Sequence, residues 1–124
     1  MTAQESSGTK LDVVFVGAGS LAGRFHYPSL RDMPDVNLKA LCDLDSDKAA
    51  AMAGEHDIPA VSRDYREMMD KEEPRAVYVV MPPHHAYDII YDCLERGLHV
   101  FSEKPPTVTT FQTRVLADLA ERNG

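Results

Sequence analysis

A glycine-rich segment near the start of the chain has the residue types and spacing of a phosphate-binding loop. It matches the pattern G-x-G-x-x-[GA] and reads Gly17-Ala18-Gly19-Ser20-Leu21-Ala22. We expect Gly17 to permit a tight turn, Gly19 to let the backbone approach a pyrophosphate, and Ala22 to keep the next helix close to a sheet. The N–H groups of the helix that begins at Ser20 would attract the phosphates. The alternatives are a structural glycine turn without a ligand and a methyltransferase loop.

A carboxylate, Asp43, follows the second apolar run, some two dozen residues beyond Gly19. A dinucleotide fold places the acid that accepts hydrogen bonds from the adenosine ribose close to this spacing. Asp45 and Asp47 come next, and Lys48 is the only cation that the local sequence places in reach. Because a 2′-phosphate would face three carboxylates, we predict NAD as the cofactor, with NADP less favoured. The alternative for Asp43 is a solvated turn acid.

Strand-like and helix-like segments alternate along the chain and would position these residues. The predicted strands are residues 11–16, 36–43, 60–62, 76–80 and 98–102, of which the third has the weakest signal. Helices are predicted over residues 20–32, 84–96 and 109–122, and after caps at Ser46 and Asp64. Such alternation implies parallel strands joined by right-handed crossovers. We therefore predict one α/β domain over residues 11–124, a doubly wound Rossmann sheet in the strand order 3-2-1-4-5.

Composition restricts the class of protein and the kind of partner. The 124 residues suffice for one domain, and the formal charge of −7 disfavours nucleic acid and membrane surfaces as partners. No apolar run approaches a membrane span, and residues 1–10 are predicted to be a disordered lead-in rather than a secretion signal. Cys42 and Cys93 are expected to be reduced thiols, with pairing as the alternative. We expect a cytoplasmic protein and predict no metal site.

Two further motifs follow the fourth and fifth predicted strands. Residues 81–85 read Met-Pro-Pro-His-His, and residues 102–106 read Ser-Glu-Lys-Pro-Pro. Together with the segments GAGSLAGRFHYPSL, CDLDSDKA and LERGLHVFSEKP, they resemble the Gfo/Idh/MocA oxidoreductase family over about residues 11–124. That family includes glucose–fructose oxidoreductase and inositol dehydrogenase. The resemblance implies an NAD(P)-dependent oxidoreductase that acts on a sugar or polyol hydroxyl by hydride transfer.

The resemblance also implies roles for residues of these motifs. Lys104 matches the family's lysine beside the nicotinamide ring and the reacting hydroxyl, where a cation favours the developing alkoxide. Glu103 matches the family's acid, which helps to hold the cofactor and the lysine. The alternative for Lys104 is a surface lysine at the end of a strand. His26 is expected behind the phosphate loop, and we assign no chemistry to it.

The segment that begins at Met81 departs from the family's pattern. It corresponds to Thr-Pro-Asn-x-x-His, of which the first residue, the asparagine and the final histidine are all replaced. We expect Met81, Pro82, Pro83 and His85 to contact the cofactor, with His84 or His85 as a substitute for the missing histidine. A histidine without a role at the start of a helix is the alternative.

All of these motifs are predicted to follow the carboxyl ends of strands, which meet at one edge of a parallel sheet. The order 2-1-4-5 places Asp43 and Lys104 three strand spacings apart, roughly 14 Å, a gap that an extended dinucleotide could bridge. Members of the resembled family are more than twice as long, with a second domain that supplies the substrate pocket and usually the oligomer interface. We expect this chain to lack that C-terminal domain, to bind cofactor without the full catalytic machinery, and to be prone to self-association. The alternative, from another class, is a non-catalytic nucleotide-binding or regulatory module.

Overall fold

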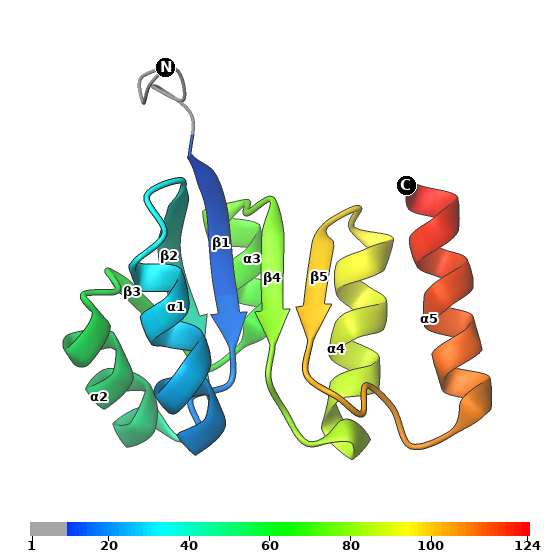
Figure 1. Cartoon of the computed structure of the whole chain (residues 1–124), viewed down its shortest axis with the longest axis horizontal. Coiled ribbons are helices and arrows are strands. Elements are labelled where there is room, and N and C mark those ends of the chain that lie inside the picture. The colour runs from blue at the N-terminus through cyan, green and yellow to red at the C-terminus, as the bar shows by residue number, and fades with distance from the viewer. Residues whose placement is uncertain (1–9) are drawn as a thin grey trace.

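A five-stranded parallel sheet forms the centre of the computed structural model, which describes residues 10–124. The strands are β1 (Leu11–Val16), β2 (Val36–Cys42), β3 (Ala60–Ser62), β4 (Ala76–Val79) and β5 (His99–Ser102). They lie in the order β3-β2-β1-β4-β5, and every neighbouring pair is parallel (Figure 1). The predicted doubly wound Rossmann sheet is confirmed, including its short third strand. The predicted lead-in lies outside the described residues except for Lys10.

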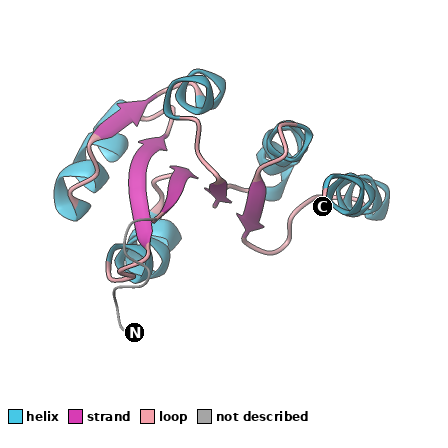
Figure 2. Cartoon of the chain, turned by 90° about the horizontal axis from the view of Figure 1, so that it is seen from above, coloured by secondary structure: helices cyan, strands magenta, loops and turns pink. Residues whose placement is uncertain are grey.

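Helical segments follow each strand and cover both faces of the sheet (Figure 2). They are η1 (Ala22–His26) and α1 (Tyr27–Arg31) after β1, α2 (Ser46–His56), α3 (Tyr65–Glu72), α4 (Pro83–Glu95) and α5 (Thr110–Asn123). The last of these, α5, packs alongside α4 at one side of the molecule (Figure 1). No helix within residues 10–124 combines the length and the apolar character that crossing a membrane requires.

The central strand β1 is buried on both of its faces. Val14 and Val16 pack in a cluster with apolar residues of α3, α4 and α5, whereas Val13 and Phe15 pack with residues of α1 and α2. Helices on both faces explain why residues 13–16 of β1 are all apolar instead of alternating with polar residues. This core holds the carboxyl end of β1, and therefore the glycine loop that follows it, in a fixed position.

The first helix has a wider turn than the sequence predicts. Helical structure runs from residue 20 to residue 31, but Ala22–His26 forms a π-turn, in which the N–H of Tyr27 donates to the carbonyl of Ala22. At the end of this turn, two consecutive side chains contact aromatic rings of the sheet. The Tyr27 ring stacks on Phe15 with centroids 4.0 Å apart, and the His26 ring meets Tyr78 edge-on at 5.9 Å. A regular α-helix would turn these two side chains about 100° apart, and π-turns recur at functional sites.

The N-cap of α2 is Asp45, so the predicted cap at Ser46 is wrong by one residue. The Asp45 carboxylate accepts hydrogen bonds from the N–H groups of Asp47 (3.1 Å) and Lys48 (3.2 Å), and Ser46 is the first helical residue. The predicted cap at Asp64 of α3 is confirmed. Both carboxylates accept two main-chain N–H groups at the positive end of a helix.

Replacing Asp45 with alanine should therefore lower the free energy of unfolding by about 1 kcal/mol, the usual cost of losing an N-cap. Ser46→Ala is the matched control, and we expect it to change stability by less than about 0.5 kcal/mol. Urea denaturation followed by circular dichroism measures both variants. A larger loss in Ser46→Ala than in Asp45→Ala would contradict the assignment and place the cap at Ser46.

Candidate functional site

A row of main-chain hydrogen bonds continues the sheet past the carboxyl ends of its strands. The residue that follows a strand donates its N–H to the last or nearly last carbonyl of the neighbouring strand. These bonds run from Asp43 to Ser62 (3.2 Å), Gly17 to Cys42 (2.8 Å), Val80 to Val16 (2.9 Å) and Glu103 to Val79 (3.3 Å). The residues that the sequence analysis singled out thus lie along one edge of the sheet, the lower edge in Figure 1.

The glycine loop is held by hydrogen bonds from two sides. Gly17 adopts a φ of +114°, and a hydroxyl from the first helix, that of buried Tyr27, donates to its carbonyl at 3.0 Å. The N–H of Ala18 donates to the Asp43 carboxylate at 2.8 Å. Burial raises the pKa of Tyr27, with a further contribution from the negative charge of Asp43, so its hydroxyl remains a donor. The sequence analysis missed Tyr27, because an aromatic residue inside a helix is the usual pattern of a core position.

The space beside the loop is open. A Cβ atom built on Gly19 would meet no atom within 4 Å, and the neighbouring Ser20 and Leu21 are exposed, whereas Ala22 is fully buried against the sheet. The first N–H groups of the helix have no intrahelical partners, and the helix dipole adds partial positive charge there. The loop therefore offers donors and space to an anionic group such as a diphosphate.

Asp43 has a second role that the sequence analysis missed. Besides accepting from Ala18 through Oδ2, it accepts from the N–H of Asp45 through Oδ1 at 2.8 Å. Each carboxylate oxygen can accept more than one hydrogen bond, so capacity remains for the hydroxyls of a ribose. Asp43 therefore joins the end of β2 to the glycine loop. Its carboxylate oxygens remain at the edge of the sheet where the strands end.

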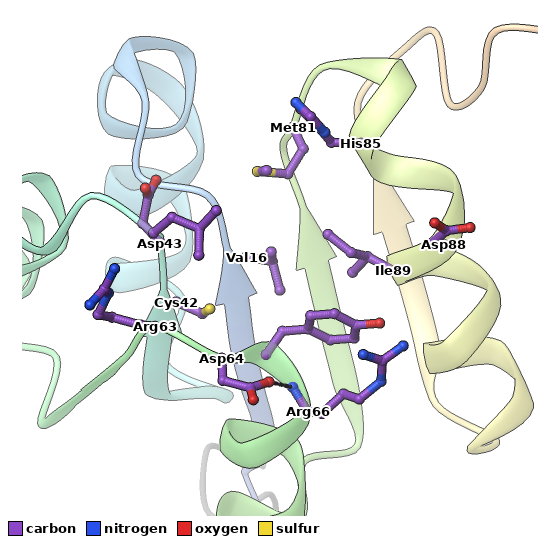
Figure 3. Close-up of a pocket in the computed structure, with 12 residues that line it drawn as sticks. Val16, Cys42, Asp43, Arg63, Asp64, Arg66, Met81, His85, Asp88 and Ile89 are labelled. Atoms are coloured by element: carbon purple, nitrogen blue, oxygen red, sulfur yellow. Dashed lines mark hydrogen bonds between the residues drawn. The ribbon is translucent and has the colours of Figure 1, made fainter.

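A cavity of about 540 Å³ opens beside Asp43, between the ends of β2 and β4 (Figure 3). Its lining is Val16, Cys42, Asp43, Leu44, Arg63, Asp64, Tyr65, Arg66, Met81, His85, Asp88 and Ile89. Figure 3 shows Asp43 on one side of the opening and Met81 and His85 on the other. The volume lies in the range of pockets that hold small molecules and cofactors.

The prediction that Lys48 is the only cation near Asp43 is wrong. Arg63 directly follows β3, whose end pairs with the end of β2, and it lines the same cavity as Asp43. Arg66, the second arginine of the cavity, donates to Asp92 at 2.8 Å, whereas Arg63 forms no ion pair within residues 10–124. The sequence analysis missed Arg63 because a short strand, and not proximity along the chain, brings it there.

Cys42 also lines this cavity, but its chemistry is restricted. Burial raises the pKa of the Cys42 thiol to about 11, and the nearby carboxylates of Asp43 and Asp64 contribute to the shift. The thiol therefore stays protonated at neutral pH and is a poor nucleophile. Cys42 and Cys93 are both free thiols, as expected.

Glu103 and Lys104 lie at the other end of the row, after β5. One carboxylate oxygen of Glu103 lies 2.7 Å from Nε2 of His26, and the other accepts the N–H of Lys104 at 3.2 Å. The bond from His26 and then that from Lys104 lower the pKa of Glu103, which is therefore ionised at neutral pH. Lys104 is exposed and forms no ion pair with the described part of the chain. The sequence analysis, which assigned no chemistry to His26, missed its contact with Glu103.

The segment after β4 lies between these two ends of the row. Pro82 is the N-cap of α4 and Pro83 its first residue, a position where proline is favoured because its missing N–H would have no partner. Met81 is half-buried and His85 exposed, and the rings of His84 and His85 lie 4.1 Å apart. Within residues 10–124, no group of three or more metal-type ligands comes together.

Known proteins that are similar to this chain in sequence or in structure match it over nearly its whole length. The D-glucoside 3-dehydrogenase of Escherichia coli K12 is 32% identical over 118 residues, which are 95% of this chain and 34% of that protein. The crystal structure of GenD2 from gentamicin A biosynthesis, in complex with NAD, superposes with a TM-score of 0.87 at 28% identity, covering 94% of this chain and 33% of that one. The structure of the 3-ketoreductase KijD10 of Actinomadura kijaniata, in complex with NADP, superposes with a TM-score of 0.85 at 25% identity. The match covers 93% of this chain and 36% of that one.

The chain thus spans about a third of the length of the relatives it matches. The matched third contains the parallel sheet and the row of residues described above. A family model described as an oxidoreductase family with an NAD-binding Rossmann fold matches residues 11–124. This chain therefore belongs to the Gfo/Idh/MocA family of oxidoreductases.

Proposed function

We propose that this chain binds a nicotinamide dinucleotide across the carboxyl edge of its sheet, as the cofactor-binding part of a sugar or polyol oxidoreductase. The observation that carries the proposal is the hydrogen-bonded row that aligns Asp43, the glycine loop and Glu103. Asp43 and Glu103 are three strand spacings apart, roughly 14 Å, which suits the length of an extended dinucleotide. Relatives named as dehydrogenases and reductases of sugars support the substrate class.

The proposed contacts follow the order of the row. The diphosphate would lie on the glycine loop and the first turn of the helix, and the adenosine ribose would bond Asp43. The nicotinamide would lie toward Glu103 and Lys104, with the segment after β4 between the two ends. The full set of proposed contacts is Gly17, Gly19, Ser20, Leu21, Ala22, Asp43, Met81, Pro82, Pro83, His85, Glu103 and Lys104.

For the cofactor, we propose NAD in preference to NADP. A 2′-phosphate at the ribose position would face the ionised Asp43, with Asp45 and Asp47 close by in the chain. Arg63 brings a compensating cation to the same cavity and limits the selectivity. We therefore expect a modest preference, on the order of tenfold, that corresponds to about 1.4 kcal/mol.

Lys104 is the proposed catalytic residue. The bound cofactor supplies the acceptor or donor of a hydride. When a hydride passes from a carbon to the cofactor, the proton of the attached hydroxyl passes to the Lys104 amine; in the reverse direction the Lys104 ammonium returns that proton and stabilises the developing negative charge on the oxygen. A positioned proton carrier typically contributes about 10²- to 10⁴-fold in rate. Lys104 is exposed, and it forms no ion pair with residues 10–124. Its amine is therefore available for this role.

Calorimetric titration of the 124-residue chain with NADH, NADPH and S-adenosylmethionine tests the proposal. We expect saturable binding of NADH, weaker binding of NADPH and none of S-adenosylmethionine. Absence of NADH binding by the folded chain would overturn the proposed function. Preferential binding of S-adenosylmethionine would indicate a methyltransferase instead.

A further inference from the structure

The widened turn at the start of the first helix brings one side chain to the far end of the row. His26 is the last residue of the π-turn, and its ring lies against the aromatic rings of Tyr78 at 5.9 Å and Phe101 at 5.4 Å, both edge-on. The side chain is 16% exposed and that of Glu103 27% exposed, so the ring is held by packing on one side and by the carboxylate on the other.

Both carboxylate oxygens of Glu103 are engaged by this arrangement. Nε2 of His26 lies 2.7 Å from Oε2, and the main-chain N–H of Lys104 donates to Oε1 at 3.2 Å. A hydrogen bond to an ionised carboxylate is shorter and stronger than one between neutral groups. The Glu103 carboxylate therefore forms a bridge between the helix that starts at the glycine loop and the backbone of Lys104.

We infer that His26 is a positioning residue, which fixes Lys104 through Glu103 and thereby links the diphosphate-binding helix to the nicotinamide end of the site. The inference rests on the proposed function for its meaning in catalysis, but the link itself is a property of the chain. His26 and Glu103 are far apart in sequence, and no other described side chain donates to the Glu103 carboxylate. Without the bond from His26, the loop that carries Lys104 would lose one of the contacts that define its position.

Two variants separate the hydrogen bond from the packing. His26→Phe keeps an aromatic ring against Tyr78 and Phe101 but removes the donor. His26→Gln keeps an N–H donor on a flexible chain and removes the ring. The readouts are the backbone amide signal of Lys104 in ¹H–¹⁵N NMR spectra of the 124-residue chain, and the affinities for NADH and for ADP-ribose, which lacks the nicotinamide. Thermal unfolding confirms that each variant is folded.

We expect His26→Phe to shift the Lys104 amide signal and to weaken NADH binding about three- to tenfold, with ADP-ribose binding unchanged. Compared with His26→Phe, His26→Gln should bring both the Lys104 amide signal and the NADH affinity part of the way back to their wild-type values. A general structural role would weaken the binding of NADH and of ADP-ribose alike. That result, or an unmoved Lys104 signal in His26→Phe, would overturn the inference.

If the wild-type chain binds no NADH, the proposed function fails, and the Lys104 signal alone then decides whether the link between His26 and Lys104 exists. If His26→Phe does not fold, His26→Leu, which also removes the donor, takes its place, with the same expected and overturning results.

Discussion

Gly17→Ala should lower the free energy of unfolding by at least ~3 kcal/mol, which is a large part of the stability of a small domain. Gly17 has a φ of +114°, a conformation that residues with a side chain rarely adopt. The added Cβ would also overlap the main-chain carbonyl of Val80. That carbonyl cannot easily move, because the N–H of Val80 is bonded to Val16 at 2.9 Å within the sheet. A fall in melting temperature of about 10 °C or more is the expected measurement.

Gly19→Ala is the matched control, with the same chemical change two residues further on. A Cβ at Gly19 meets no atom within 4 Å, so we expect stability to stay within about 0.5 kcal/mol of the wild type. NADH binding should nevertheless weaken at least about tenfold, since the methyl group occupies the space through which a diphosphate approaches the backbone. Equal stability of the two variants would contradict the tight turn at Gly17. Unchanged NADH binding by Gly19→Ala would place the diphosphate elsewhere.

The fold could be predicted because its signals are local. The apolar segment Leu11–Val16 ends at a glycine, and Pro83 starts a helix that Gly97 follows in a left-handed conformation. Even the three-residue strand Ala60–Ser62 lies where the sequence predicts it, because alternation of strand and helix requires a strand between α2 and α3.

The contacts that support the site were not predictable in the same way, because they join distant segments. The N–H of Ala18, which follows β1, donates to the carboxylate of Asp43, which follows the neighbouring strand β2. Arg63 lines the same cavity as Asp43 because β3 pairs with β2. His26, which contacts Glu103, is the last residue of a π-turn, and no residue pattern used in the sequence analysis signals such a turn. Periodicity identifies which residues face a sheet but not which residue of another strand they meet.

Asp43→Ala should weaken NADH binding by about 100-fold, and it should weaken NADPH binding much less. The variant removes the proposed acceptor of the ribose hydroxyls, and a hydrogen bond to a charged group contributes about 1.5–3 kcal/mol. It also leaves the N–H of Ala18 without its partner at 2.8 Å, which loosens the glycine loop under the diphosphate. The loss for NADPH is smaller because the variant also removes a negative charge that repels the 2′-phosphate. Parallel calorimetric titrations with the two cofactors measure the ratio of the affinities.

Asp47→Ala provides the control for charge alone. It changes the net charge by the same amount at a nearby position, the first turn of α2, but the Asp47 side chain forms no hydrogen bond or ion pair with residues 10–124. Screening by salt reduces the influence of an exposed charge over about 10 Å, so we expect less than a threefold change in NADH affinity for this variant. If the two variants were equally impaired, the proposed preference for NAD would come from the combined negative charge of Asp43, Asp45 and Asp47. If only Asp43→Ala changes the ratio of NADH to NADPH affinity, the discrimination depends on direct contact at the end of β2, where the Asp43 carboxylate also holds the glycine loop.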